Sequence, residues 1–371
     1  MIRAALQREK LGVGVVMDAA HTSTARCMPW LVSQHEDPAK PLPPMSNYAQ
    51  QNPAASLCVS VIAPTINPRH WSHESLYRSF AEQTHALKEL LVLDEGPEPS
   101  PFFATIVANP QVSYTHICTR PEQRQQTLER LREASVRAET PESRRAWGAL
   151  IGELEGSGAL SIGVKRNWLV AQARGPLIAH FDDDDVYLPS YLSRMAAVLM
   201  GSGAGLVKLA SWLHFDANRD ALAYFDGNRV RAVSTYGGAS QRTFWGYGFS
   251  YVYLRFLALE VPFEPLNNDE DNTFILAAAR RTTVLAYADM PGDATVCHVA
   301  HRANSSRVVD AAGMSDHMSG EGADSGAAHP LTEGTASADA AAFDAFFGGA
   351  GCRVLLGAAL RRCGRQTDGR R

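Results

Sequence analysis

Residues 177–185 read Leu-Ile-Ala-His-Phe-Asp-Asp-Asp-Asp, an apolar stretch that runs directly into four adjacent aspartates. A short, continuous apolar run of this kind is typical of a strand that is buried on both faces of a parallel sheet. The aspartates then follow its carboxyl end, where ligands bind in open α/β sheets. Because adjacent carboxylates repel one another, the run is either a solvated acidic turn or a site for a cation.

The segment before this strand has the strand, helix, strand order of a parallel α/β sheet. Residues 57–63 are apolar and rich in β-branched side chains, and residues 64–68 end the run with two prolines. A helix is expected around Leu76 and Phe80, followed by a second buried strand at 89–93. Further strands are predicted over 112–118, 177–181, 206–215, 249–253 and 283–289, helices over 122–134, 163–175, 188–200 and 270–281, and an insertion of undefined structure over 139–160.

The composition excludes several classes of protein. The chain has 371 residues, of which 45% are hydrophobic and 20% charged, so a wholly disordered chain is not expected. A formal net charge of -4 argues against a nucleic-acid-binding surface. Six scattered cysteines without a Cys-x-x-Cys pair argue against a disulfide scaffold or a cysteine metal cluster. No apolar run is long enough to predict a membrane-spanning helix, and the short run at 11–17 disfavours a secretory signal.

Shifts in composition divide the chain into four parts. Five prolines within residues 37–53 mark a linker, so residues 1–55 are predicted to be an arm outside the folded domain. Residues 56–305 form the predicted α/β domain. Residues 306–342 are low in packable side chains and are predicted to be disordered. Residues 343–371 are a short apolar segment with a basic tail, either a peripheral membrane anchor or a solvated surface helix.

Five short motifs occur in a fixed order along the α/β domain. They read Val-Ser-Val-Ile-Ala-Pro-Thr-Ile-Asn at 59–67, Leu-Val-Leu-Asp-Glu-Gly at 91–96, Gly-Val-Lys-Arg-Asn at 163–167 with Ala-Arg-Gly at 173–175, Ile-Ala-His-Phe-Asp-Asp-Asp-Asp at 178–185 with Leu-Pro at 188–189, and Asn-Asp-Glu-Asp-Asn-Thr-Phe at 268–274. Together they resemble the motifs of family-2 glycosyltransferases over about residues 57–305.

The resemblance implies a GT-A fold, with a Rossmann-like, mostly parallel central sheet flanked by helices, to which the composition adds disordered N- and C-terminal tails. It also implies an inverting transfer of one sugar from a UDP- or GDP-sugar to a hydroxyl acceptor, with Mn²⁺ or Mg²⁺ as cofactor. The chain departs from the family where Asp94-Glu95-Gly96 is followed by proline. It lacks the Gln-x-x-Arg-Trp motif of processive synthases, which favours transfer of a single sugar.

For the donor nucleotide, the resemblance assigns Pro64 and Thr65 to the loop against the nucleotide. It implies that Asp94 accepts hydrogen bonds from the base, with Glu95 as the alternative. Arg166 is expected to pair with the nucleotide or its diphosphate, since a planar guanidinium suits phosphate. Alone, this arginine would equally be a surface residue at a helix start.

For the metal, the resemblance places Asp182 and Asp183 near the ribose and the ion, with Asp184 as the first choice for direct coordination and Asp182 as a second ligand. Hard divalent cations take one or two carboxylates and complete their shell with water and phosphate oxygens. His301 is expected to complete the protein ligands, slightly ahead of His298. A lone histidine is otherwise more often structural.

An inverting transfer needs a general base on the acceptor side. The resemblance assigns this role to Asp271, with Glu270 as the runner-up. Alternatively, both carboxylates simply favour a helix N-terminus, where negative charge is stabilised.

Two other functions fit the same residues. One is a pseudoenzyme that binds a nucleotide sugar without turnover, and the other is a nucleotidyltransferase-like enzyme on a related scaffold. The sequence does not name the acceptor, and a glycan, a lipid, a protein and a small molecule all remain open. The location expected from the resemblance is cytoplasmic, or peripheral at the cytosolic side of a membrane.

Overall fold

The computed structural model of the chain describes residues 53–106, 109–217, 221–226, 245–289, 294–301 and 328–330. The predictions for the arm up to residue 52 and for the apolar segment and basic tail at 343–371 lie outside these ranges. The domain boundaries at 55, 305 and 342 stay predictions. Among the described residues, no helix has the length and apolar character needed to cross a membrane.

A seven-stranded central sheet is formed in the order β10-β6-β9-β4-β1-β2-β3. All of its pairings are parallel except those of β9, which runs antiparallel to both β4 and β6. This arrangement confirms the predicted α/β class with a mostly parallel sheet. The strands are β1 (Val59–Ile66), β2 (Lys88–Gly96), β3 (Val112–Cys118), β4 (Leu177–His180), β6 (Leu206–Leu209), β9 (Val252–Leu254) and β10 (Val284–Tyr287).

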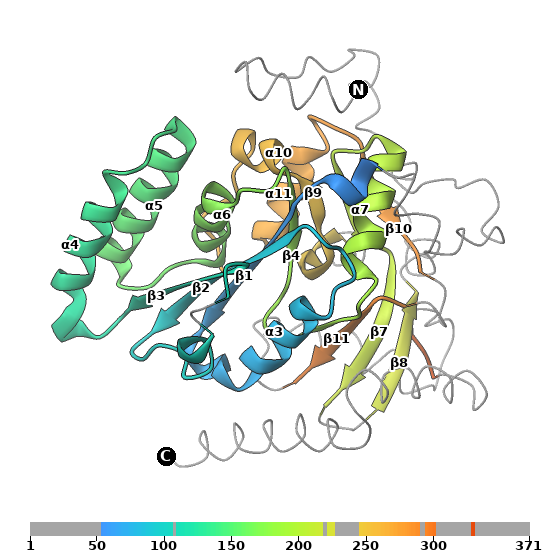
Figure 1. Ribbon diagram of the computed structural model, residues 1–371, viewed down its shortest axis with the longest axis horizontal. Helices are drawn as coiled ribbons and strands as arrows, with labels where there is room; N and C mark the ends of the chain where they lie inside the picture. The colour runs from blue at the N-terminus through green and yellow to red at the C-terminus, as the bar shows by residue number, and fades with distance from the viewer. Residues whose placement is uncertain are drawn as a thin grey trace.

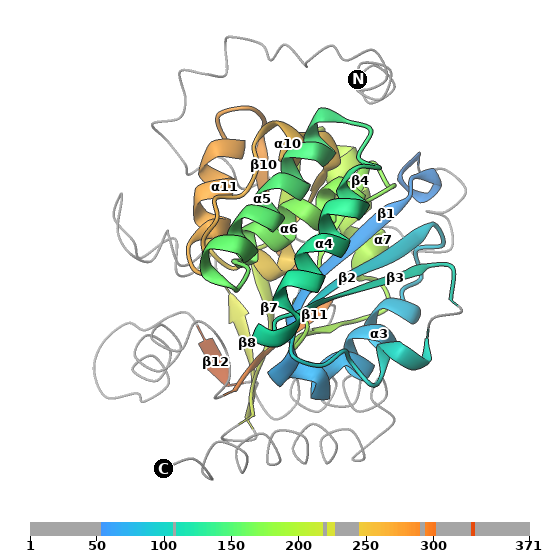
Figure 2. The same ribbon diagram turned by 90° about the vertical axis from the view of Figure 1, so that its left-hand side faces the viewer.

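Helices cover both faces of this sheet, and Figures 1 and 2 show α4, α5 and α6 together on the face opposite α3. The α-helices are α3 (His73–Ala81), α4 (Arg124–Ser135), α5 (Pro141–Ser157), α6 (Ile162–Gln172), α7 (Tyr191–Ser202), α10 (Arg255–Glu260) and α11 (Glu270–Ala278). The 3₁₀ helices are η4 (Pro53–Ser56), η5 (Asn67–Ser72), η6 (Phe103–Thr105), η7 (Pro121–Gln123) and η8 (Gly248–Ser250).

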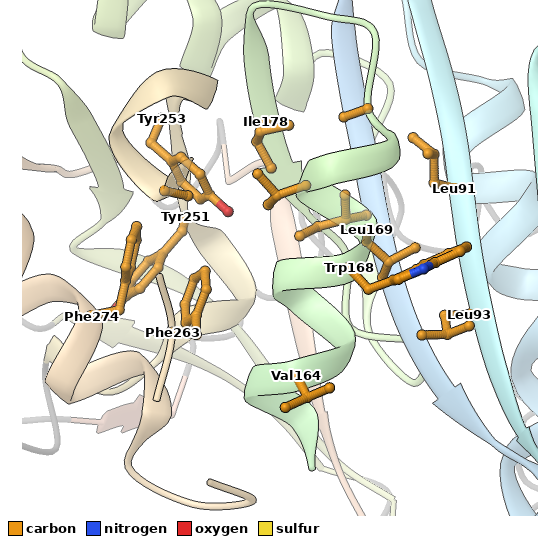
Figure 3. Packing of buried hydrophobic residues seen from close by; sticks show 14 of the residues in the cluster. Leu91, Leu93, Val164, Trp168, Leu169, Ile178, Tyr251, Tyr253, Phe263 and Phe274 are labelled. Carbon is orange, nitrogen blue, oxygen red and sulfur yellow. The ribbon is translucent and has the colours of Figure 1, made fainter. Parts of the chain in front are cut away.

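The alternation of side chains along β1 and β2 divides the core into two layers. Val61 and Val92 pack in one cluster with apolar residues of α3 and α7. Ile62 and Leu91 point to the other face, into a cluster with α4, α5, α6, α10 and α11. Figure 3 shows α6 at the centre of this second layer, between the β2 side chains and an aromatic group made of Tyr251, Tyr253, Phe263 and Phe274.

A second sheet, in the order β12-β8-β7-β11-β5, packs beside the first. Its strands are β5 (Val186–Tyr187), β7 (Ser211–Asp216), β8 (Ala221–Asp226), β11 (Val296–Ala300) and β12 (Ala328–Pro330). The single strand predicted over 206–215 was therefore wrong, because the chain leaves the central sheet at Ala210 and enters the second one. An apolar run predicts that a segment is buried, but it does not indicate which sheet supplies the hydrogen-bond partners. Within residues 306–342, whose predicted disorder stays a prediction, the structure describes Ala328–Pro330, which pairs antiparallel with β8.

The sequence left the structure of the insertion over 139–160 uncertain, and most of it is helix α5. Thr140 caps the helix by accepting a hydrogen bond from Ser143, and Pro141 occupies the first turn. Gly158 ends it in the left-handed conformation at φ 77°. These start and stop signals were present in the sequence.

Candidate active site

A cavity of about 620 Å³ lies beyond the carboxyl ends of β1, β2 and β4. The strand order reverses there, with β2 on one side of β1 and β4 on the other, and such a switch point is where α/β sheets bind ligands. The residues lining the cavity are Pro64, Thr65, Ile66, Arg69, Glu95, Thr119, Gly158, Ala159, Leu160, Ile162, Lys165, Arg166, Asp182, Asp183, Asn267 and Asn268.

Arg166 connects the four aspartates to helix α11. Its Nη1 lies 2.5 Å from Oε1 of Glu270, and its Nη2 lies 3.5 Å from Oδ1 of Asp182. The guanidinium is almost fully buried and reaches the cavity from α6. Gly163 permits the close approach of α6, because a Cβ there would stand 1.8 Å from the carbonyl oxygen of Glu264. Arg166 therefore holds two predicted site segments together across the cleft.

At the end of β2, the structure brings Glu95 and not Asp94 to the cavity. Glu95 pairs with Lys165 at 2.6 Å and accepts a hydrogen bond from the Leu160 amide at 2.8 Å. Asp94 is fully buried beneath it, bonded to the His70 ring at 2.8 Å and to the Tyr114 hydroxyl at 2.6 Å. Alternation along the strand explains this difference, because successive side chains point to opposite faces.

Asp182 and Asp183 are the two members of the acidic run that line the cavity. Asp182 keeps a side-chain exposure of 34%, whereas the Asp183 side chain is fully buried. Asp183 accepts a short hydrogen bond from the Thr65 hydroxyl and lies 2.6 Å from Nη1 of Arg69. Burial and the neighbouring carboxylates raise the pKa of Asp182 to about 7, against the opposing charge of Arg166.

Asp184 and Asp185 do not line the cavity, and each lies against a histidine of the β11 segment. Oδ2 of Asp184 lies 3.0 Å from Nε2 of His301, and also 3.0 Å from Nη1 of Arg69. Oδ1 of Asp185 lies 2.9 Å from Nδ1 of His298. Although burial acts to raise it, Arg69 and His301 hold the pKa of Asp184 below its ordinary value. The two histidines considered from the sequence thus have different partners, and His301 is the one beside Asp184.

The pair Asp184 and His301 suits a divalent ion as a donor set of one carboxylate and one imidazole. Such a pair leaves most of the coordination shell to water and phosphate oxygens, as Mg²⁺ sites in nucleotide-binding proteins do. Nε2 of His301 would have to present its lone pair rather than a proton. Among the described residues there is no group of three or more His, Cys, Asp or Glu side chains that could hold a metal by itself.

Asp271 lies in the first turn of α11, after Asp269 in the left-handed conformation. Its Oδ2 accepts from the Gly248 amide at 3.2 Å and its Oδ1 from the Asn272 amide at 2.7 Å. Burial, with the charge of Glu270 added, raises the pKa of Asp271 to about 6. Glu270 forms a buried ion pair with Arg166, whereas Asp271 has no ion pair at this distance among the described residues. Neither residue lines the cavity itself.

Two charged residues of the cavity were missed by the sequence analysis. Arg69 comes from η5, just after the loop with Pro64 and Thr65, and Lys165 precedes Arg166 on α6. Lys165 sits inside a quoted motif, so its position was a usable signal. Nothing in the sequence indicated that Arg69 would contact two aspartates more than a hundred residues away.

Comparisons with known proteins give matches among solved structures. No family model matches the chain, and no curated protein matches it. S. aureus TarS 1–349 in complex with UDP-GlcNAc is 15% identical with a TM-score of 0.42, covering 67% of this chain and 60% of that one. The longer S. aureus TarS structure matches at 15% identity and a TM-score of 0.41, and the match spans only 37% of its chain and 66% of this one.

Glucosyl-3-phosphoglycerate synthase from Mycobacterium tuberculosis, in complex with Mn²⁺, UDP and phosphoglyceric acid, is also similar. It is 19% identical with a TM-score of 0.38, covering 63% of this chain and 69% of that one. The α/β architecture with a mostly parallel sheet is the one that the resemblance to GT-A glycosyltransferases predicts.

Proposed function

We propose that the chain is a metal-dependent, inverting glycosyltransferase that moves one sugar from a UDP- or GDP-sugar to a hydroxyl acceptor. The observation that carries the proposal is a single cavity at the switch point, lined by Thr65, Glu95, Arg166 and Asp182, with the pair formed by Asp184 and His301 next to it.

The cavity suits a nucleoside diphosphate. Three cationic side chains, Arg69, Lys165 and Arg166, reach it and favour an anionic ligand. Glu95 offers a carboxylate to the N–H groups of a base, and Asp182 offers one to ribose hydroxyls. A volume of about 620 Å³ falls within the range of small-molecule sites.

Asp184 and His301 would hold a Mn²⁺ or Mg²⁺ ion, which when bound stabilises the charge that develops on the departing diphosphate. Asp182 lines the cavity beside Asp184 and would order water or ribose at that point. Thr65 donates to Asp183 and so fixes the acidic run against the end of β1.

Asp271 acts as the general base in this proposal. It accepts the proton of the acceptor hydroxyl while that oxygen forms a bond to the anomeric carbon and the bond from that carbon to the diphosphate breaks. A pKa of about 6 leaves it ionised at neutral pH and close to the working range of a base. Glu270 keeps Arg166 in position by their buried ion pair.

The pseudoenzyme and the nucleotidyltransferase-like enzyme are the rival functions, and turnover separates them from the proposal. The acceptor is a glycan, lipid or protein, and nucleic acid is not proposed as a partner. The proposed location is the cytoplasm or the cytosolic side of a membrane, and only the resemblance supports it.

Calorimetric titration with UDP and GDP, each with and without Mn²⁺, tests the donor site. Asp182→Asn is the test variant, and Glu129→Gln on the exposed side of α4 is the control, since both replace a carboxylate by an amide. We expect one nucleotide to bind more tightly with Mn²⁺, and Asp182→Asn to weaken it about tenfold or more, as loss of a charged hydrogen-bond partner does. The absence of nucleotide binding, or equal affinities for the two variants, would contradict the proposal.

A further inference from the structure

Arg69 stands among the acidic residues as a resident cation. Its Nη1 lies 2.6 Å from Oδ1 of Asp183 and 3.0 Å from Oδ2 of Asp184. The side chains of these aspartates are 0% and 4% exposed, so solvent does little to screen their charges. Two adjacent buried carboxylates need a positive charge nearby, and the guanidinium of Arg69 supplies one.

The same carboxylate oxygen is the one that a metal ion would use. Oδ2 of Asp184 is 3.0 Å from Nε2 of His301, so a divalent ion held by both would lie against this oxygen. Ligand oxygens stand about 2.0–2.6 Å from such ions. A guanidinium nitrogen 3.0 Å from the same oxygen therefore competes with the ion for its charge and its space.

Arg69 also lies where it could pair with a bound diphosphate instead of Asp184. Its side chain keeps 15% exposure and lines the cavity that the nucleotide diphosphate is proposed to occupy. A guanidinium fork pairs with phosphate oxygens as well as with carboxylates. A diphosphate in the cavity would thus draw Arg69 from Asp184 and, in the same event, bring phosphate oxygens to complete the metal's shell.

We propose that Arg69 is an internal counter-cation that occupies the metal-binding carboxylate until the nucleotide binds, so that the metal and the nucleotide diphosphate bind with positive coupling. The inference rests on the proposed function and extends it to the order of binding. Because coupling is reciprocal, Mn²⁺ must tighten nucleotide binding by the same factor by which the nucleotide tightens Mn²⁺ binding.

Free Mn²⁺ measured by electron paramagnetic resonance, with and without UDP or GDP, tests this directly. Without nucleotide, Arg69→Gln should bind Mn²⁺ about tenfold or more tightly than the wild type, since a competing charge is gone. Arg69→Lys retains the charge and should stay close to the wild type. Arg132→Gln removes an exposed arginine that pairs with Glu155 on the remote helices, and serves as the matched control.

A charge-balanced variant keeps the test valid if Arg69→Gln is poorly folded. Arg69→Gln combined with Asp183→Asn removes one charge of each sign and leaves Asp184 and His301 intact. It should also gain Mn²⁺ affinity, and its melting temperature should rise more with Mn²⁺ than that of the wild type. In both variants, the tightening of Mn²⁺ binding by nucleotide should shrink.

Two failures are distinguishable. If nucleotide binds, but Arg69→Gln and Arg132→Gln have the same affinity for Mn²⁺, the inference is overturned and the proposed function stands. If neither UDP nor GDP binds to any variant, the proposed function fails and the coupling fails with it.

Discussion

Replacement of Asp271 by asparagine should make the protein more stable and, if Asp271 is the general base, much slower in turnover. The side chain is partly buried, and its pKa is raised from 3.8 to about 6, first by burial and then by the charge of Glu270. At 1.36 kcal/mol per pKa unit, this rise corresponds to about 3 kcal/mol against the ionised form in the native state. Residual exposure screens part of it, so we expect about 1–3 kcal/mol.

The sign of the effect depends on pH. Below about pH 4 the carboxyl group is protonated in both folded and unfolded chains, and asparagine offers no advantage. Between about pH 4 and pH 6 the unfolded chain ionises first, so the native state loses stability. Above about pH 6 the loss of stability is complete. Asp271→Asn should then unfold at a higher urea concentration than the wild type, with the full difference of about 1–3 kcal/mol in the free energy of unfolding.

Turnover should move in the opposite direction. Loss of a general base lowers the rate by about 10²–10⁴-fold. In the wild type, kcat/KM should fall as the pH drops through about 6, and this limb should be missing from the residual activity of Asp271→Asn. Urea titrations at several pH values and initial rates over the same range measure both effects. A variant that loses stability at pH 8, or that turns over as the wild type does, would refute the assignment of the base.

Two further pairs of variants test the residues that pack around the cavity. Arg166→Met should lower the free energy of unfolding by about 3–5 kcal/mol because it leaves Glu270 buried without its cation. The double variant with Glu270→Gln should recover much of that free energy. Equal melting temperatures for the single and the double variant would contradict the role of the ion pair. Gly163→Ala should cost about 1–3 kcal/mol because its Cβ meets the carbonyl of Glu264, whereas Gly152→Ala, with no atom within 4 Å, should gain about 1 kcal/mol. Urea unfolding of the two glycine variants measures the contrast, and effects of the same sign would show that the close approach is not needed.

Much of the central sheet could be predicted because most of its strands are buried on both faces, with the partly buried edge strand β3 as the exception. Val112–Cys118 was predicted with the bounds that the structure has, and β1 and β2 within a few residues. The split at Ala210 could not be predicted, since both halves of residues 206–215 are apolar and only tertiary pairing assigns them to different sheets. Helix α5 was missed although Thr140 and Gly158 marked its ends, because its charged residues masked the apolar spacing.

The candidate site followed from motifs rather than from periodicity. The resemblance assigned Arg166 to the donor nucleotide and Asp182 to the ribose and the metal, and both residues line the cavity. The choice between Asp94 and Glu95 depended on which of the two alternating side chains of β2 points toward the cavity, and the sequence does not say which face of the strand that is. The contact of Arg69 with the acidic run joins residues 114 and 115 positions apart, a distance over which no sequence pattern operates.

The measurement that tests the central claim most directly is release of nucleoside diphosphate from a panel of UDP- and GDP-sugars, with Mn²⁺ and with a chelator. Wild type, Asp184→Asn and the control Glu129→Gln are compared at neutral pH. We predict release from one donor that needs the metal, survives Glu129→Gln and is lost in Asp184→Asn. No release from any donor, or release that Asp184→Asn leaves unchanged, would contradict the account.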